Sequence, residues 1–360
     1  MFTPLRHINS IFLKTRPIHL TFFVTRKCNS KCPFCFYLKS SESKVSAEEL
    51  SLDEIQKVSK SLGSLLWLAF SGGEIYLRDD LVEISKVFYK NNRPAIMLYP
   101  TNGLLPELIR DRTEEILIHC KKSVIAVKLS INGLNEAHDK LRSTPHSFDK
   151  TMETYSLLEE LLEKYPNFEL GVNTVFCSEN QDSMDRIIDF VSGLKNIKTH
   201  TISLIRGSLA DESYKKIDYK KYLKAIKRLE ENLKNKTSGT YRFRGARIKA
   251  AQDILQRNLI HRTLLEQKRL IPCYAGRLNL VLTENGDVYP CEILTERLGN
   301  AKDYEYDIKK ILRSENAKKI LASIQDKKCF CTHECYFMTN ILFNPKLYPA
   351  LAKEYLQLKS

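Results

Sequence analysis

Hydrophobic residues recur in short runs along the first 210 positions of this chain, and longer stretches with helical periodicity separate the runs. The short runs are rich in β-branched and aromatic residues, as buried strands are. Six strands are predicted, at residues 18–25, 66–71, 95–101, 124–131, 169–176 and 201–205. Amphipathic helices are predicted between them, at 47–62, 80–90, 106–120, 148–164 and 181–194. Strands that alternate with helices indicate a parallel sheet with right-handed crossovers.

Six strand–helix units are too few for a closed eight-stranded barrel. The pattern therefore predicts an α/β fold, a partial (β/α)6 TIM barrel, over residues 1–210. Two long basic helices, at 218–236 and 245–270, predict a helical connector over residues 211–270. Residues 271–360 are rich in cysteine and short turns and end in a helix, which predicts a second, small domain.

A β-hairpin is predicted inside this second domain. Residues 278–290 form an apolar stretch with Asn285-Gly286 in its middle, a favoured two-residue turn. Cys273 and Cys291 stand near the two ends of the stretch, so the hairpin would bring them close together. Three more cysteines follow, Cys329, Cys331 and Cys335.

The composition is that of a globular protein, with 43% hydrophobic and 28% charged residues in 360. No charge-free run reaches the roughly 18 apolar residues of a membrane helix, and no signal peptide is visible. We therefore expect a cytoplasmic protein without a membrane partner. Ten cysteines in such a protein point to metal binding or chemistry rather than to a disulfide framework.

The formal charge of +14 is large, with dense basic patches at 215–228 and 242–249. An anionic partner or substrate would explain it, and so would solvated helix faces. We favour solvated faces, because the basic residues form no stripe with interleaved aromatics. A nucleic-acid partner is not expected.

Three cysteines follow the first predicted strand in the spacing C-x3-C-x2-C: Cys28, Cys32 and Cys35. A cubane [4Fe–4S] cluster normally takes four thiolates, so three thiolates leave one iron open to an outside ligand. In open parallel sheets and barrels, chemistry occurs at the carboxyl ends of the strands, and this triplet lies just past such an end. The triplet therefore indicates a reaction centre rather than an electron carrier.

With an aromatic residue, Phe34, before its last cysteine, the triplet resembles that of the radical S-adenosylmethionine (radical SAM) enzymes. The resemblance implies a [4Fe–4S] cluster whose open iron binds SAM. It also implies reductive cleavage of SAM to methionine and a 5′-deoxyadenosyl radical, which abstracts hydrogen from a substrate. A reductant such as flavodoxin or ferredoxin is implied as well.

Further strand ends match the pattern with which this family binds SAM. By resemblance, the glycine pair and the following glutamate face the amino group of SAM. Serine and arginine are candidates for the ribose hydroxyls and the carboxylate, since the planar guanidinium suits a carboxylate. The implied SAM-binding residues are Gly72, Gly73, Glu74, Asn102, Ser130, Arg142 and Asn173. For Asn173 the alternative is an amide that only satisfies a strand edge.

One residue departs from the family pattern. Asn132 stands where related enzymes usually carry aspartate, and an amide carries no charge, which weakens any role for a base here. Cys177 and Tyr76 are catalytic candidates, as hydrogen donors to a substrate radical. The alternative for Cys177 is a small buried residue at a strand end.

The C-terminal cysteines resemble the SPASM/twitch extension of radical SAM enzymes, which implies one auxiliary [4Fe–4S] cluster. Full SPASM domains carry C-x2-C-x5-C-x3-C, and only the final C-x3-C, Cys331 to Cys335, is present here. Cys273, Cys291 and Cys335 are the expected ligands, and Cys329 and Cys331 compete for the fourth place. A structural zinc site with four thiolates is the alternative.

The predicted function is that of a radical SAM oxidoreductase or maturase that oxidises or cross-links a substrate with help from the auxiliary cluster. The substrate is left open between a peptide and a sugar-like small molecule. The alternative function is a non-catalytic structural or electron-transfer protein that binds zinc or iron–sulfur clusters.

Overall fold

Six parallel strands form the centre of the molecule and lie side by side in chain order. The computed structural model describes residues 1–41, 48–235, 241–243, 245–326 and 329–358. The strands are β1 (His19–Thr25), β2 (Trp67–Gly72), β3 (Ile96–Thr101), β4 (Val124–Ser130), β5 (Phe168–Phe176) and β6 (Thr199–Leu204). Their parallel pairing confirms the predicted α/β fold class.

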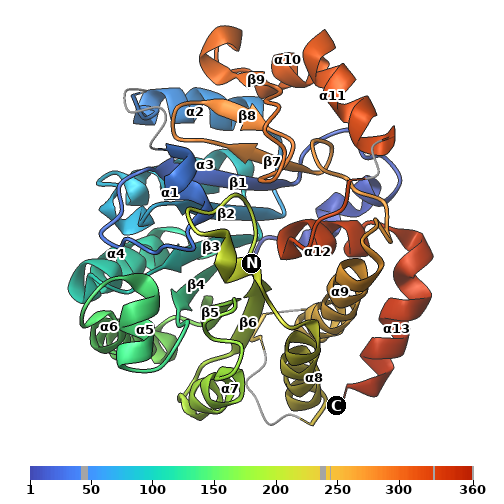
Figure 1. Ribbon diagram of the computed structural model, residues 1–360. Helices are drawn as coiled ribbons and strands as arrows, with labels where there is room; N and C mark the ends of the chain where they lie inside the picture. Colours follow the sequence, from blue (N-terminus) through green and yellow to red (C-terminus); the bar gives the residue numbers. More distant parts are fainter. Residues whose placement is uncertain (42–47, 236–240, 244, 327–328, 359–360) are drawn as a thin grey trace.

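Helices connect the strands and cover the outer face of the sheet (Figure 1). They are α2 (Leu52–Ser61), α3 (Leu81–Asn92), α4 (Pro106–His119), α6 (Ser147–Lys164) and α7 (Met184–Gly193). Two short helices were not predicted, α1 (Phe36–Ser41) and α5 (Glu136–Arg142). Residues 47 and 236, at the ends of two predicted helices, lie outside the described residues.

Aromatic side chains fill the space between the strands and the helices. Phe22 of β1 and Phe70 of β2 both pack against Phe88 of α3, with ring centroids 6.0 and 6.5 Å apart. All seven residues of β1 are buried, because helices cover one face and the barrel interior the other. The polar residues His19, Thr21 and Thr25 on one face of the strand are therefore buried like its apolar residues.

The connector consists of two long helices, α8 (Tyr219–Asn235) and α9 (Ala246–Glu266). In the C-terminal region, α12 (Glu334–Leu342) and α13 (Tyr348–Gln357) both contact α9 (Figure 1). Two further helices, α10 (Ile308–Arg313) and α11 (Glu315–Asp326), occur where only short turns were predicted. Among the described residues, none of the helices combines the length and the apolarity needed to cross a lipid bilayer.

The predicted hairpin is present, and it extends the barrel sheet. Its strands β7 (Asn279–Leu282) and β8 (Asp287–Tyr289) are antiparallel, and β9 (Gly299–Asn300) pairs with β8. β7 also pairs in parallel with β1, with His19 opposite Asn279, so the sheet has nine strands. The C-terminal region is thus joined to the strand that precedes the cysteine triplet.

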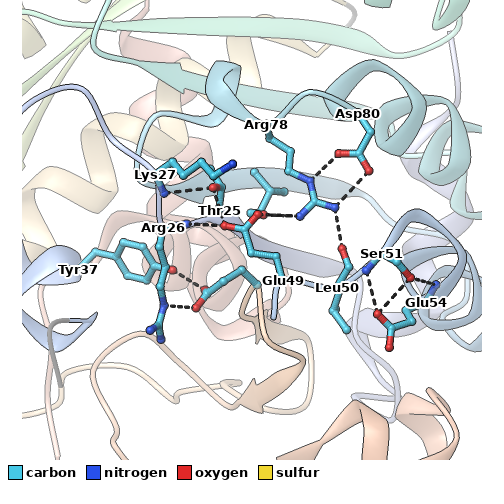
Figure 2. A network of polar contacts seen from close by, with 12 residues as sticks. Thr25, Arg26, Lys27, Tyr37, Glu49, Leu50, Ser51, Glu54, Arg78 and Asp80 are labelled. Carbon is cyan, nitrogen blue, oxygen red and sulfur yellow. Dashed lines mark hydrogen bonds and ion pairs between the residues drawn. The ribbon is translucent and has the colours of Figure 1, made fainter. Parts of the chain in front are cut away.

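A network of buried and half-buried charges fastens the end of β1 to its neighbours (Figure 2). Glu49 accepts hydrogen bonds from Thr25 Oγ1 at 2.7 Å and from the Arg26 amide at 3.1 Å. Its other oxygen accepts from Arg78 Nη1 at 3.1 Å, and the same guanidinium binds both carboxylate oxygens of Asp80. Arg78 is nearly buried, so loss of these carboxylates would leave its charge without a partner, and the network fixes the base of the cysteine loop.

The same loop is tied to the C-terminal hairpin by Glu284, which is 1% exposed. Its two carboxylate oxygens accept hydrogen bonds from Arg26 Nε and from the Tyr37 hydroxyl. Arg26 precedes the cysteine triplet and Tyr37 follows it, so one hairpin residue holds both ends of the loop.

Candidate active site

The three loop cysteines lie between the end of β1 and the start of α1, and all three line one large cavity. Backbone amides approach two of the sulfurs: Ser30 N donates to Cys28 Sγ at 3.4 Å and Leu38 N to Cys35 Sγ at 3.5 Å. Ser30 Oγ lies 3.2 Å from Cys32 Sγ. Such contacts stabilise thiolates and tune the potentials of iron–sulfur clusters.

Burial raises the pKa of the Cys28 thiol to about 11 and raises the pKa of Cys35 as well. Metal binding requires thiolates, so ligation by this loop must release protons. The half-buried setting of three thiols at a strand end, with amides aimed at sulfur, fits a cluster.

The cavity has a volume of about 400 Å3 and runs from the cysteine loop into the barrel interior. Each of the sequence-predicted SAM-binding residues lines it, namely Gly72, Gly73, Glu74, Asn102, Ser130, Arg142 and Asn173. They come from the carboxyl ends of β2, β3 and β4, from the second half of β5, and from the end of α5. The size is within the range of ordinary small-ligand sites, about 300–1,000 Å3.

The turn after β2 packs directly onto the cysteine loop. Gly73 donates its amide to Thr25 O at 2.9 Å, and the Glu74 amide donates to Lys27 O at 2.8 Å. A side chain at position 73 would have its Cβ 2.1 Å from Lys27 O, which only glycine avoids. The glycine therefore allows the two loops that surround the cavity mouth to touch.

Glu74 is buried, and its carboxylate is used within the chain. One oxygen accepts from Thr101 Oγ1 at 2.9 Å and the other from the Asn102 amide at 2.7 Å. The Asn102 side chain in turn donates to Asn29 Oδ1 at 2.7 Å and lies 3.9 Å from Cys28 Sγ. Glu74 thus holds the end of β3 against the cysteine loop.

Arg142 is 6% exposed and faces the cavity, and its Nε has no hydrogen-bond partner among the described residues. Its carbonyl accepts hydrogen bonds from Ser30 Oγ and Thr144 Oγ1, which anchors the residue beside the cysteine loop. A buried guanidinium with a free donor fits the carboxylate of SAM.

Ser130 and Asn173 lie opposite each other on β4 and β5. Asn173 Oδ1 accepts a hydrogen bond from Ser203 Oγ at 2.9 Å. Asn132, the residue that departs from the family pattern, uses its side-chain oxygen to accept from the Val175 amide at 2.8 Å. It therefore joins β4 to the end of β5.

The two catalytic candidates lie away from the cavity. Cys177 is fully buried in a small apolar cluster with Phe34, Leu141 and Ile205. Tyr76 is also fully buried, and its hydroxyl lies 2.7 Å from Thr113 Oγ1. Neither residue lines the described part of the cavity.

The structure separates the five C-terminal cysteines into two groups. Four of them, Cys273, Cys291, Cys329 and Cys331, line a second cavity of about 60 Å3, whereas Cys335 lines the large one. Burial raises the pKa of Cys291 to about 11 and that of Cys331 to about 12. Among the described residues, no three metal-binding side chains lie close enough together to hold a single ion.

Donors reach the sulfurs of this second group too. Arg269 Nη2 lies 2.8 Å from Cys329 Sγ, and the Leu294 amide donates to Cys291 Sγ at 3.3 Å. Hydrogen-bond donors beside ligand sulfurs are a feature of iron–sulfur sites, where they tune the cluster potential.

Several cavity residues were not found from the sequence. Arg206, just after β6, contacts Glu292 and Glu334 of the C-terminal region, at 3.4 and 3.5 Å, and lies over the ring of Phe36. Lys128 points into the cavity from the middle of β4. A lysine inside an otherwise apolar predicted strand was the available signal for it.

Comparison with known proteins agrees with this geometry. Residues 22–191 match the family model of the radical SAM superfamily, and residues 273–336 match that of the SPASM iron–sulfur cluster-binding domain. The chain is 33% identical over 147 residues to the antilisterial bacteriocin subtilosin biosynthesis protein AlbA of Bacillus subtilis, covering 40% of this chain and 31% of AlbA. It is 25% identical over 185 residues to the sporulation killing factor maturation protein SkfB of the same organism, covering 51% of this chain and 42% of SkfB. The chain therefore spans less than half the length of these relatives.

A solved structure shares the fold over nearly the whole chain. The structure of anSMEcpe with bound AdoMet and Kp18Cys peptide superposes with a TM-score of 0.62 at 18% identity, covering 95% of this chain and 100% of that one.

Proposed function

Because this chain is a radical SAM protein with a C-terminal SPASM domain, we propose that it modifies a peptide by hydrogen abstraction in the large cavity. The observation that carries this proposal is the lining of that cavity. One continuous space of about 400 Å3 joins the three loop thiols, the predicted SAM-binding residues and the side chains of His333 and Cys335 from the C-terminal region.

At one end of the cavity, Cys28, Cys32 and Cys35 would hold the SAM-binding cluster. Arg142 would bind the SAM carboxylate, and the Gly73 turn would contact its methionine part. When bound, the cluster and SAM supply one-electron chemistry that removes a hydrogen atom from the substrate. The chain's own residues orient SAM and keep the reacting groups away from bulk water.

A peptide is favoured over a sugar-like substrate for two reasons. AlbA and SkfB are named for bacteriocin biosynthesis and for maturation of a killing factor, and anSMEcpe was solved with a bound peptide. At the C-terminal side of the cavity, Arg206 Nε and Glu334 Oε1 also have no hydrogen-bond partner among the described residues. A free donor and a free acceptor suit the carbonyl and amide groups of a peptide backbone.

The test uses the anaerobically reconstituted protein with SAM, a flavodoxin or ferredoxin reducing system, and peptides encoded by short reading frames beside its gene. We expect 5′-deoxyadenosine together with a peptide that is lighter by the hydrogens removed, measured by mass spectrometry. The Cys28→Ala variant is the control and should give neither product. If the protein converts a sugar-like compound and leaves every peptide unchanged, the substrate is a sugar-like molecule and the peptide proposal is wrong.

We also propose that Cys273, Cys291, Cys329 and Cys331 would hold the auxiliary cluster, whereas Cys335 would face the substrate. The shared cavity of the first four thiols supports this set, as does the position of Cys335 on the wall of the large cavity. In this set Cys329 and Cys331, which competed for the fourth place in the sequence analysis, are both ligands. Cys335, which the C-x3-C spacing had favoured, is not a ligand.

Iron analysis distinguishes the two ligand sets. In a background with Cys28, Cys32 and Cys35 changed to alanine, only the auxiliary cluster remains, with about four irons. There, Cys331→Ser should remove most of the iron, whereas the matched Cys335→Ser should keep it. Loss of iron in Cys335→Ser, with iron retained in Cys331→Ser, would show that Cys335 is a ligand and Cys331 is not.

A further inference from the structure

The interior of the barrel is built as a pocket. In closed barrels, large branched side chains fill the interior in layers. Here small and polar residues face inward at many positions of the strands, including Thr21, Ala69, Ser71, Ala126, Gly171, Thr199, Thr201 and Ser203. The space that they leave extends the cavity from the predicted SAM-binding residues toward the amino ends of the strands.

Lys128 projects from β4 into this deeper space. Its ammonium donates a hydrogen bond to Thr199 Oγ1 of β6, and no described carboxylate lies within ion-pair distance of it. The nearby Lys249 and Asp253 form an ion pair with each other, and Asp253 also accepts from the Tyr241 hydroxyl at 3.0 Å. Burial lowers the pKa of Lys128 to about 7, as expected for a cation that the chain does not neutralise by contact.

Gly171 makes room for the lysine. This residue lies in the middle of β5, between Lys128 on β4 and Thr199 on β6. A Cβ at position 171 would lie 2.6 Å from Lys128 Nζ and 2.3 Å from Thr199 Oγ1. Glycine weakens a strand, and inside one it often marks a close approach. Here it lets the lysine cross β5 and reach Thr199.

Two more polar atoms of the same space lack a partner among the described residues. Glu169 is 6% exposed, and its Oε2 accepts no hydrogen bond, although Oε1 accepts from the Arg242 amide. Trp67 Nε1 is also unpaired. Both residues line the cavity. Buried polar atoms are normally paired, so a free acceptor and a free donor on the wall of the cavity that Lys128 enters indicate a bound ligand.

We propose that Lys128 and Thr199 form a subsite that binds a carboxylate of the substrate beneath SAM, with Glu169 accepting a neighbouring N–H. The inference rests on the proposed function, because it places a substrate group in the same cavity. Lys128 lies two residues before Ser130 on the same face of β4, so the subsite is about 7 Å deeper than that residue. One lysine beside a free glutamate oxygen suits a singly charged carboxylate better than a doubly charged phosphate.

In a peptide, this carboxylate is either an Asp or Glu side chain or the C-terminal carboxylate. Three probes distinguish the two sources: N-acetyl-glutamate amide, N-acetyl-glutamine with a free carboxylate, and the neutral N-acetyl-glutamine amide. Binding to the reconstituted, SAM-loaded protein is followed by the fluorescence of Trp67, the single tryptophan of the chain. A Trp67→Phe variant establishes that the signal comes from the cavity.

We expect one carboxylate probe to bind roughly 10- to 100-fold more tightly than the neutral amide, as a charge-assisted hydrogen bond provides. Lys128→Gln should abolish this preference without changing the affinity for SAM. Lys121→Gln removes the same charge at an exposed position and should leave the preference intact. Equal binding of all three probes, or a preference that survives in Lys128→Gln, overturns the subsite. If the protein cleaves SAM but shows no preference, only the proposed subsite is refuted. If the protein does not cleave SAM, the proposed function is refuted.

Discussion

Changing Cys28, Cys32 and Cys35 together to alanine is expected to lower the iron content from about eight to about four per chain and to abolish 5′-deoxyadenosine formation. The reason is that these three thiols line the mouth of the large cavity and supply every protein ligand of the SAM-binding cluster in the proposed site. Iron and acid-labile sulfide are measured on the anaerobically purified protein, and the nucleoside is measured by chromatography.

Cys120 and Cys177 provide the matched control. Both are fully buried and neither lines either cysteine cavity, so alanine at these two positions should leave iron, sulfide and 5′-deoxyadenosine unchanged. If the unaltered protein contained zinc and little iron, its assignment as a radical SAM enzyme would be wrong and a structural metal-binding role would be supported. Residual 5′-deoxyadenosine in the triple variant would contradict the assignment of the triplet.

Gly73→Ala should reduce SAM cleavage by at least roughly 100-fold and lower the free energy of unfolding by about 3 kcal/mol. The new Cβ would lie 2.1 Å from Lys27 O, 2.7 Å from Lys27 C and 2.9 Å from Arg26 O. All three are backbone atoms, so the clash cannot be relieved by moving a flexible side chain. Either the turn after β2 or the cysteine loop must shift, and both line the proposed SAM site.

The control for this variant is Gly193→Ala at the end of α7, where an added Cβ has no atom within 4 Å. Chemical denaturation and the dissociation constant for SAM are measured for both variants. Unchanged SAM affinity and stability in Gly73→Ala would show that the contact between the two loops does not define the site.

The strands of the barrel could be read from the sequence because they are short runs rich in β-branched and aromatic residues that alternate with helical stretches. β1 is the clearest case, since all seven of its residues are buried. The hairpin could also be read, from Asn285-Gly286 between two apolar segments. α5 could not, because its seven residues give less than two helical turns of pattern, and its buried His138 and Arg142 look like surface residues in the sequence.

The pairing of β7 with β1 was beyond local reasoning. His19 and Asn279 are 260 residues apart, and neither segment carries a local sequence signal that indicates which strand it pairs with. The grouping of the C-terminal cysteines was equally hidden, because spacing alone favoured Cys335, whereas the structure lines the small cavity with Cys329 and Cys331. Motif residues at strand ends were visible, but Lys128 and Arg206 acquire their neighbours only when distant strands meet.

The parallel pairing of β7 with β1 also fixes the order in which the molecule can be assembled. One edge of β1 has to wait until Asn279 has been synthesised, which takes on the order of 10–50 s at about 5–20 residues per second. During that interval Glu284 cannot yet bind Arg26 and Tyr37. The loop with the three cysteines then has only contacts to the part of the chain that has already been synthesised. During translation the cysteine loop therefore exists for a time without the two contacts that Glu284 later makes to its ends.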